Sequence, residues 1–242
     1  MRLLVVGAGA MGRWFAESAA GEEDEVAFAD ADPDAAREAA EAVGGRTVDA
    51  PVEETFDLVC VAVPLPAAAD VIAEYADAAE RAICDVTGSM RDPIAAMREH
   101  CPDGERASLH PLFAPENAPG AVATVVDESG PLTEAVRERL TDRGNETFET
   151  TPAEHDEAME TVQARAHTAV LAFAVAAEEV PDAFHTPISE GLFDLVEQVT
   201  GGEARVYSDI QAAFDGADDV ADAARRIADA DQEAFAELYE QL

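Results

Sequence analysis

Six residues near the N-terminus, Gly7-Ala8-Gly9-Ala10-Met11-Gly12, constrain the fold more than any other segment of this chain. They follow an apolar run at 3–6 and open a helical pattern over about Met11 to Ala20. Glycine lets the backbone turn tightly and approach a pyrophosphate, while the following helix presents unpaired N–H groups and the positive end of its dipole. In this strand-to-helix context the segment predicts dinucleotide binding; the alternative is a purely structural turn.

An acidic residue follows at the position that selects the cofactor. Asp30 comes directly after the second apolar run, Val26 to Ala29, and 18 positions beyond Gly12, close to the ~20 typical of a ribose-binding carboxylate. Its carboxylate would accept hydrogen bonds from the ribose hydroxyls and repel a 2′-phosphate, and Pro33 and Asp34 offer that phosphate no arginine. We therefore expect NAD rather than NADP. The residues predicted to contact it are Gly7, Gly9, Ala10, Met11, Gly12, Asp30, Val63 and Pro64.

Short apolar runs alternate with alanine-rich helical patterns through the first half of the chain. This alternation predicts an α/β fold, a doubly wound, mostly parallel sheet of the Rossmann type covered on both faces. After Thr151-Pro152 the pattern becomes helical, beginning with one long segment over 153–178. We expect a dinucleotide-binding domain over 1–152 and an all-helical C-terminal domain over 153–242. Strands are expected at 3–6, 26–29, 46–48, 58–63, 82–86, 107–110, 122–126 and 146–149, and helices include 33–43, 132–142 and the tail 217–242.

The charge balance limits the partners. The chain has 242 residues, of which 52 are Asp or Glu and 15 are basic, all of them Arg, giving a net charge of -37. Nucleic acid and anionic membrane surfaces are therefore not expected partners, because both require a cationic surface. Disorder is excluded because 48% of the residues are hydrophobic and fall in periodic segments. Such a surface repels itself unless salt screens it, so we expect a halophilic protein, with an ordinary acidic mesophile as the alternative.

The cysteines and apolar runs indicate a simple intracellular chain. Cys60 and Cys84 lie in strand-like runs and are expected in the core, whereas Cys101 is expected in a loop or at a helix end. Their spacing indicates neither a metal site nor a disulfide framework. The N-terminal apolar run is too short for a signal peptide, and the longest later run, Thr168 to Ala177, falls below the ~20 residues of a membrane span. We expect a cytoplasmic location.

Three of the five histidines lie where they could perform chemistry. His110 follows a strand, at the edge of the sheet where side chains approach a bound nicotinamide. His155 and His167 lie in the helical half, and Gln163 shares a helix face with His167. Taken alone, each histidine is better explained as a capping, core or surface residue. An imidazole beside a nicotinamide would instead suit proton transfer.

Six segments along the chain match known motifs in order. They are Gly7 to Gly12; Asp85-Val86-Thr87-Gly88-Ser89-Met90-Arg91, similar to D-x-x-S-x-K; Ser108 to Pro115, similar to H-P-M-F-G-P; Glu154-His155-Asp156; the helix through Gln163 and His167; and Tyr207-Ser208-Asp209-Ile210-Gln211, similar to L-Y-A-D-I-Q. Taken together, these segments resemble the prephenate dehydrogenase family, which includes arogenate dehydrogenases. The resemblance implies oxidation of a ring carbinol by NAD with loss of carbon dioxide, giving 4-hydroxyphenylpyruvate for tyrosine synthesis.

The resemblance also implies roles for individual residues. His110 would accept a hydrogen bond or a proton from the substrate hydroxyl, and Ser89 would bond the same region, so these two are the predicted catalytic residues. The helical domain would supply substrate contacts and a homodimer interface. The predicted substrate-binding residues are His167, Tyr207, Arg91, Gln163, Gln198 and Arg205.

Two positions depart from the family pattern. Gln198 stands where the family usually has the arginine that clamps the side-chain carboxylate of the substrate. Because glutamine cannot form a bidentate guanidinium fork, either Arg205 or another arginine substitutes, or the substrate is held more weakly. Arg91 replaces the family's lysine and keeps its charge. Arogenate therefore remains an alternative substrate, and a non-catalytic NAD-binding regulatory protein of the same fold remains an alternative function.

Overall fold

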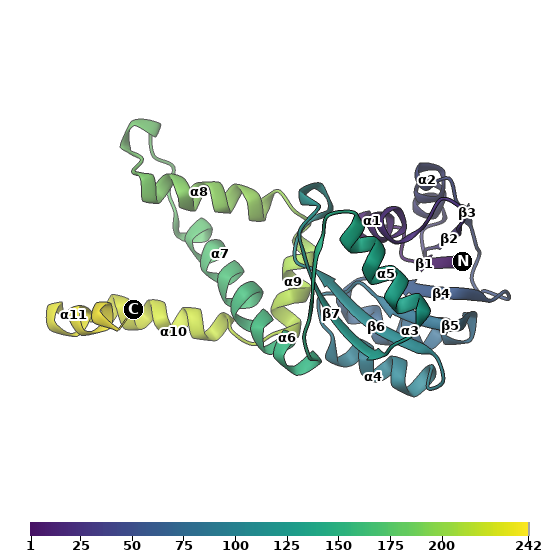
Figure 1. The fold of residues 1–242 in the computed structure, drawn as a ribbon. Helices are drawn as coiled ribbons and strands as arrows, with labels where there is room; N and C mark the ends of the chain where they lie inside the picture. The colour runs from purple at the N-terminus through teal and green to yellow at the C-terminus, as the bar shows by residue number, and fades with distance from the viewer. Residues whose placement is uncertain (242) are drawn as a thin grey trace. The chain divides into compact units, whose positions relative to one another are not determined.

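The computed structural model describes residues 1–241, with only the backbone at Asp182. The chain divides into two compact units, Met1–Asp156 and Glu157–Leu242. The first is an α/β unit and the second is built from helices (Figure 1). No helix of the described residues is long and apolar enough to cross a membrane.

The described chain forms one eight-stranded sheet in the order β3-β2-β1-β4-β5-β6-β7-β8. Every neighbouring pair is parallel except β6 and β7, which run antiparallel. The predicted fold class, a mostly parallel doubly wound sheet followed by helices, is confirmed. The strands are β1 Arg2–Val6, β2 Glu25–Ala29, β3 Arg46–Thr47, β4 Phe56–Val61, β5 Ala79–Asp85, β6 Glu105–Pro111, β7 Ala121–Glu128 and β8 Glu146–Glu149.

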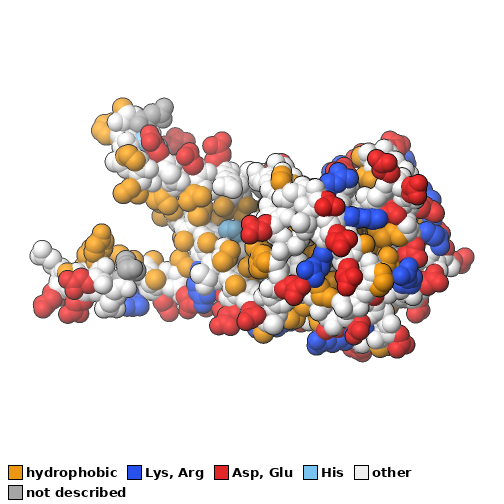
Figure 2. Space-filling view, in the orientation of Figure 1, with side chains coloured by type: hydrophobic (Ala, Val, Ile, Leu, Met, Phe, Trp, Pro, Cys, Tyr) orange, Lys and Arg blue, Asp and Glu red, His pale blue; other side chains and the backbone are white. Residues whose placement is uncertain are grey.

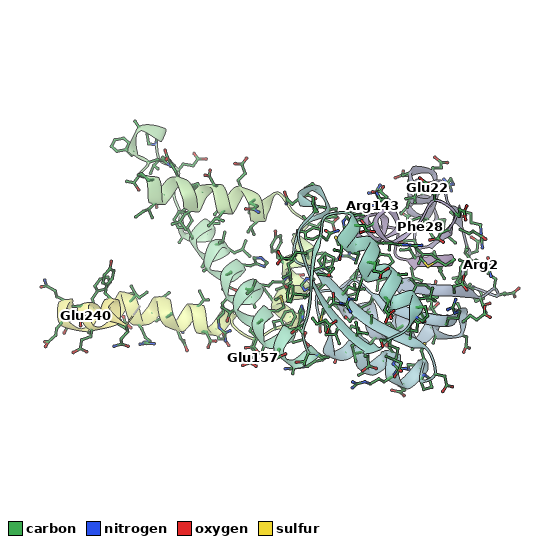
Figure 3. The ribbon with its side chains drawn as sticks, viewed as in Figure 1. Arg2, Glu22, Phe28, Arg143, Glu157 and Glu240 are labelled. Carbon is green, nitrogen blue, oxygen red and sulfur yellow. The ribbon has the colours of Figure 1, made fainter. Side chains whose placement is uncertain are left out.

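Helices cover the sheet on both faces (Figure 1). One core contains side chains of α1, α2 and α5, and the other contains side chains of α3 and α4. Phe28 of β2 belongs to the first core, and its place is marked in Figure 3. Cys60 and Cys84 are buried in neighbouring strands and Cys101 ends α4, as predicted. These helices are α1 Ala10–Ala19, α2 Pro33–Val43, α3 Ala68–Tyr75, α4 Arg91–His100 and α5 Pro131–Asp142.

The last two strands bring the chain back toward His110. Thr124 of β7 pairs with Leu109 of β6 on one side and with Glu149 of β8 on the other. Because β8 has only four residues, it ends beside Thr124 in the middle of β7 rather than at the far end of that strand. The next helix, α6 Pro152–Met159, therefore begins within a few residues of the C-terminal end of β6.

The second unit is a series of helices, and it includes the segment predicted as one long helix over 153–178. A π-helical turn, Glu160–Arg165, interrupts that segment, which ends as α7 at Ala176. The predicted tail helix is broken between α10 and α11, and Leu242 lies outside the described residues. The remaining helices are α7 Ala166–Ala176, α8 Pro187–Thr200, α9 Ala204–Ala213, α10 Ala217–Asp229 and α11 Gln232–Glu240.

Candidate active site

The loop between β1 and α1 is shaped by glycines that cannot be replaced without moving the backbone. Gly7 has φ +102°, and a Cβ there would lie 2.2 Å from the carbonyl oxygen of Ala62. A Cβ on Gly12 would lie 1.9 Å from the carbonyl oxygen of Gly7. Gly9 differs, because nothing lies within 4 Å of the place its Cβ would take. The loop is therefore tightly packed at Gly7 and Gly12 and leaves open space at Gly9, just before α1.

The N-terminus of α1 is also the right electrostatic partner for an anion. The helices α2, α3, α4 and α5 each carry an acidic residue in the first turn, whereas α1 has none. Its N-cap, Gly9, supplies no side chain to occupy the first N–H groups. In a chain with 52 acidic residues, this end of α1 keeps its positive dipole available to a phosphate.

Asp30 lies against this loop. Its Oδ2 accepts a hydrogen bond from the backbone N–H of Ala8 at 2.7 Å, and its Oδ1 accepts one from the N–H of Asp32 at 2.8 Å. Each carboxylate oxygen has a further lone pair for a ribose hydroxyl. Val63 also reaches the loop, since its Cγ1 would lie 3.2 Å from a Cβ on Gly7, and Pro64 follows it half-buried. These residues fit a dinucleotide with an unmodified ribose.

Three side chains form a buried hydrogen-bonded series at the C-terminal end of β6. Nδ1 of His110 lies 2.9 Å from Nε2 of His155, and Nδ1 of His155 lies 2.8 Å from Oδ1 of Asp156. The exposed fractions of the three residues are 7%, 3% and 6%. Burial and the neighbouring His155 lower the pKa of His110 to about 3, although Asp156 acts in the opposite direction.

The carboxylate of Asp156, at one end of this series, determines which nitrogen of each histidine carries a proton. Burial tends to raise the pKa of Asp156, but hydrogen bonds from His155 and from the N–H groups of Met90 and Arg91 outweigh it and lower that pKa, so the side chain is an ionised acceptor. Nδ1 of His155 must then donate, which leaves its Nε2 to accept from Nδ1 of His110 when both rings are neutral. Nε2 of His110 is consequently the basic nitrogen.

A glycine leaves room beside that nitrogen. A Cβ on Gly88 would lie 3.7 Å from Nε2 of His110, which places the loop after β5 next to the basic edge of the imidazole. The same loop carries Ser89, whose Oγ donates to Oδ2 of Asp156 at 3.4 Å. Arg91 follows with its Nε 3.9 Å from the same oxygen, and its guanidinium donates to the carbonyl of Ala153 at 3.2 Å.

Asp85, at the end of β5, holds the loop that follows this strand through hydrogen bonds from Thr87. It is fully buried, and its Oδ2 accepts hydrogen bonds from the N–H and Oγ1 of Thr87. The Oγ1 of Thr87 lies 3.2 Å from the carbonyl oxygen of Ser89. Burial raises the pKa of Asp85 to about 7, and Thr87 and Ser108 only partly offset this. A carboxyl group kept in such a costly place is typical of a functional site.

The remaining predicted site residues lie in the second unit. The rings of His167 and Tyr207 meet edge to face with centroids 5.0 Å apart, and burial lowers the pKa of His167 and raises that of Tyr207. Gln163 is half-buried in the π-helical turn. Gln198 on α8 and Arg205 on α9 are exposed, and no contact between these two is recorded among the described residues.

Four residues that complete the first unit's group have no predicted role in the site, and His155, although noted as a candidate, is one of them. Asp156 was part of a matching segment but was not placed in the site, and Asp85 and Gly88 were motif positions without a function. The signal for Asp156 was its place beside His155, because adjacent histidine and aspartate can form a donor and acceptor pair. Asp85 gave no local signal, since its burial depends on strands far apart in the sequence.

Comparison with known proteins places the chain in a family. Residues 2–88 match the family described as NADP oxidoreductase coenzyme F420-dependent. A 4-amino-4-deoxyprephenate dehydrogenase from Streptomyces pristinaespiralis is 31% identical over an alignment 267 positions long, gaps included, which covers 99% of this chain and 89% of that protein. This chain belongs to the prephenate dehydrogenase family. It is therefore an oxidoreductase of that family.

Solved structures of prephenate dehydrogenase relatives share the fold. Prephenate dehydrogenase from Aquifex aeolicus, in complex with hydroxyphenyl propionate and NAD+, has a TM-score of 0.75 at 15% identity, covering 99% of this chain and 95% of that chain. Synechocystis arogenate dehydrogenase has a TM-score of 0.64 at 16% identity, covering 100% and 97%. At these identities the likeness is one of fold.

Proposed function

We propose that this prephenate dehydrogenase family member oxidises prephenate to 4-hydroxyphenylpyruvate for tyrosine synthesis, with NAD as the hydride acceptor and loss of carbon dioxide. The observation that carries the proposal is the series His110, His155 and Asp156, which supplies a neutral imidazole with its basic Nε2 beside a loop glycine. The residues of the first loop would hold NAD, and Asp30 favours it over NADP because a 2′-phosphate would meet a carboxylate.

The chemistry requires little of the base, which suits a buried histidine. As hydride leaves the carbinol carbon, positive charge grows on the hydroxyl, and Nε2 of His110 accepts its proton or hydrogen bond. The electron pair of the breaking bond to carbon dioxide completes the aromatic ring, so the step is strongly downhill and a weak base suffices. A proton taken by His110 returns to the oxygen, because the product keeps a phenolic hydroxyl. The cation that forms on His110 is stabilised through His155 by the carboxylate of Asp156.

Arg205 is our candidate for the arginine that Gln198 replaces. It lies in the first turn of α9, is exposed, and forms no ion pair with any residue that the structure describes. Arg13, Arg143 and Arg226 likewise have no ion pair with a described residue, but Arg205 is the arginine nearest to Gln198 in the sequence, and its guanidinium suits a substrate carboxylate. Arg205→Ala should raise the KM for prephenate at least tenfold, an effect of about 1.4 kcal/mol. Arg226→Ala, at an exposed arginine of α10, is the matched control and should leave that KM unchanged.

Arogenate and 4-amino-4-deoxyprephenate are the competing substrates. The second has specific support, because the 31% identical relative is named for it. His110 does not separate the three compounds, since a neutral Nε2 accepts a hydrogen bond from a hydroxyl or an amino group alike. Incubating the protein with NAD and each compound in molar salt, and following NADH absorbance, tests the proposal. A prephenate rate well below either rival would refute it.

A homodimer is the assembly we propose. Among the residues that the structure describes, all but one of the exposed large hydrophobic side chains lie in the second unit, including Val175 at 89%, Ile188 at 78% and Phe184 at 76% exposed. Figure 2 shows hydrophobic side chains on the surface of that unit, whereas carboxylates and arginines are scattered over the surface of the first. Apolar surface of this kind marks contact with another protein. Light scattering in molar salt should give twice the monomer mass; a monomer alone would exclude the proposal.

A further inference from the structure

The sequence of the π-helical turn Glu160–Arg165 does not itself specify this geometry. Its hallmark is the N–H of Ala166, which bonds to the carbonyl of Thr161 five residues back. The segment contains neither glycine nor proline, so nothing in it disfavours the ordinary α-helical geometry of the helices on either side. Wide turns of this type are rare and are frequent at functional sites. Contacts from outside the helix must therefore hold this one.

Gln211 on α9 makes the first such contact. Its Nε2 donates to the carbonyl oxygen of Ala164 at 3.0 Å, and its Oε1 accepts from Oγ1 of Thr168 at 2.9 Å. The amide orientation follows from the partners, because a carbonyl can only accept. Ala164 is fully buried, so loss of Gln211 would leave a carbonyl with no access to water.

Gly216, just before α10, makes the second contact. Its φ is +139°, which glycine tolerates and other residues rarely adopt. A Cβ there would lie 2.7 Å from Cγ of Arg165 and 3.1 Å from the carbonyl oxygen of Glu160, so its backbone lies directly against the turn. The guanidinium of Arg165 also pairs with Asp219 of α10 at 2.6 Å.

The turn leads directly to His167. The ring of His167 packs edge to face on Tyr207, which lies one helical turn before Gln211 on α9. Nδ1 of His167 is buried and has no hydrogen-bond partner among the described residues. One face of α9 thus contacts both the ring of His167, through Tyr207, and the π-helical turn before it, through Gln211. Nδ1 of His167 is left to bond with a ligand.

We propose that Gln211 is a positioning residue, which holds the π-helical turn so that the imidazole of His167 is fixed in orientation toward the substrate. The inference rests on the proposed function only in giving His167 a substrate to contact. The positioning itself is a property of the second unit and can be measured without substrate.

The kinetic test compares variants that remove one or both of the hydrogen bonds made by Gln211. Gln211→Leu keeps the size and loses both bonds, and Gln211→Glu keeps an acceptor for Thr168 but turns an oxygen toward the carbonyl of Ala164. Both should raise the KM for prephenate about tenfold or more while kcat and the KM for NAD stay within about twofold. Thr168→Val removes only one bond and should have a smaller effect in the same direction. Gln232→Leu, at an exposed glutamine of α11, should have none.

The second test follows the His167 ring by NMR in the absence of substrate, with its signal assigned by loss in His167→Asn. In the parent protein burial lowers the pKa of His167, and in Gln211→Leu that pKa should rise because water reaches the ring. If Gln211→Leu does not fold, Thr168→Val should show the same shift to a smaller extent. An unchanged His167 signal and unchanged KM overturn the inference, as does a uniform loss of kcat and stability. An enzyme inactive on prephenate whose His167 signal still shifts would refute the proposed function alone.

Discussion

Nε2 of His155 lies 2.9 Å from Nδ1 of His110, and both rings are buried. This contact determines which nitrogen of His110 is basic, because His155 is itself oriented by a carboxylate. The imidazole that meets the substrate is thus set by a residue from a helix about 45 positions later in the chain.

Replacing Asp156 tests this orientation. Asp156→Asn removes the charge and offers His155 an amide that can donate, so the basic nitrogen of His110 is no longer specified. We expect kcat to fall about 10²- to 10⁴-fold, the range of positioned acid–base catalysis. Stability should also fall modestly, since Asp156 accepts from the N–H groups of Met90 and Arg91. Asp92→Asn, at an exposed acid of α4, is the control; similar activity of the two variants would contradict the orientation argument.

His110 should act as a base over an unusually wide pH range. Its pKa is lowered to about 3, so the ring remains neutral at any pH well above that value. The kcat/KM of the parent protein for prephenate should therefore not fall as the pH is lowered through 6.5 because of protonation of His110. Any fall seen there should also be present in His110→Asn. The variant itself should lose about 10²- to 10⁴-fold in kcat. Near parent turnover by His110→Asn would remove it from the mechanism.

Substitution of Gly9 should weaken cofactor binding without affecting folding. Nothing lies within 4 Å of a Cβ on Gly9, so Gly9→Ala should fold with an unchanged melting temperature. The methyl group would nevertheless occupy the space that a pyrophosphate needs, and we expect NADH affinity to fall at least tenfold. Trp14 on α1 is the one tryptophan of the chain, so its fluorescence reports binding. Gly191→Ala, at an equally open glycine of α8, should leave NADH affinity unchanged; equal affinities of both variants would refute the cofactor site.

Asp85 should destabilise the folded chain at neutral and alkaline pH. Its pKa is about 7 in the folded state and about 3.9 when unfolded, so between these values the folded chain binds more protons and its stability falls as pH rises. About three units at ~1.36 kcal/mol each is about 4 kcal/mol. Asp85→Asn should therefore gain up to that amount at pH 8 and little at pH 4, measured by denaturant unfolding. Asp77→Asn, at an exposed residue, should gain nothing; an equal gain at both pH values would contradict the argument.

Salt should stabilise both the fold and the complexes. At a net charge of -37 the surface repels itself and also repels NAD and prephenate, which are anions. The Debye length falls from about 10 Å at 0.1 M to about 3 Å at 1 M, so molar salt screens both effects. We expect the melting temperature to fall and both KM values to rise as salt is lowered. Flat values between 0.1 M and molar salt would contradict a halophilic protein.

Local signals explain why some of the fold could be predicted. Helix α2 spans 33–43 as expected, because Asp32 caps it, Pro33 opens it and Gly44 ends it in the left-handed conformation. The antiparallel pairing of β6 and β7 was not predicted, although the nine residues between them are too few for a parallel crossover. The spacing from strand to loop was enough to select His110 as a candidate.

Contacts between distant segments explain the rest. The π-helical turn could not be predicted, since Gln211 and Gly216 impose it on residues that otherwise favour an α-helix. The role of Asp156 could not be read either, because the Met90 and Arg91 N–H groups that keep it ionised come from a loop more than 60 positions earlier. A sequence indicates which residues can react, and the long-range contacts decide their protonation.

Because β8 is short, the number of residues between the end of β8 and His155 matters for function. His155 reaches His110 because β8 ends at Glu149 and α6 begins at Pro152, so the length of this connection places the His155 ring. One residue added or removed between Glu149 and His155 would shift the imidazole while leaving the identity of every side chain in the group intact. Homologues that differ in this spacing would carry the same motifs and still lack the same base.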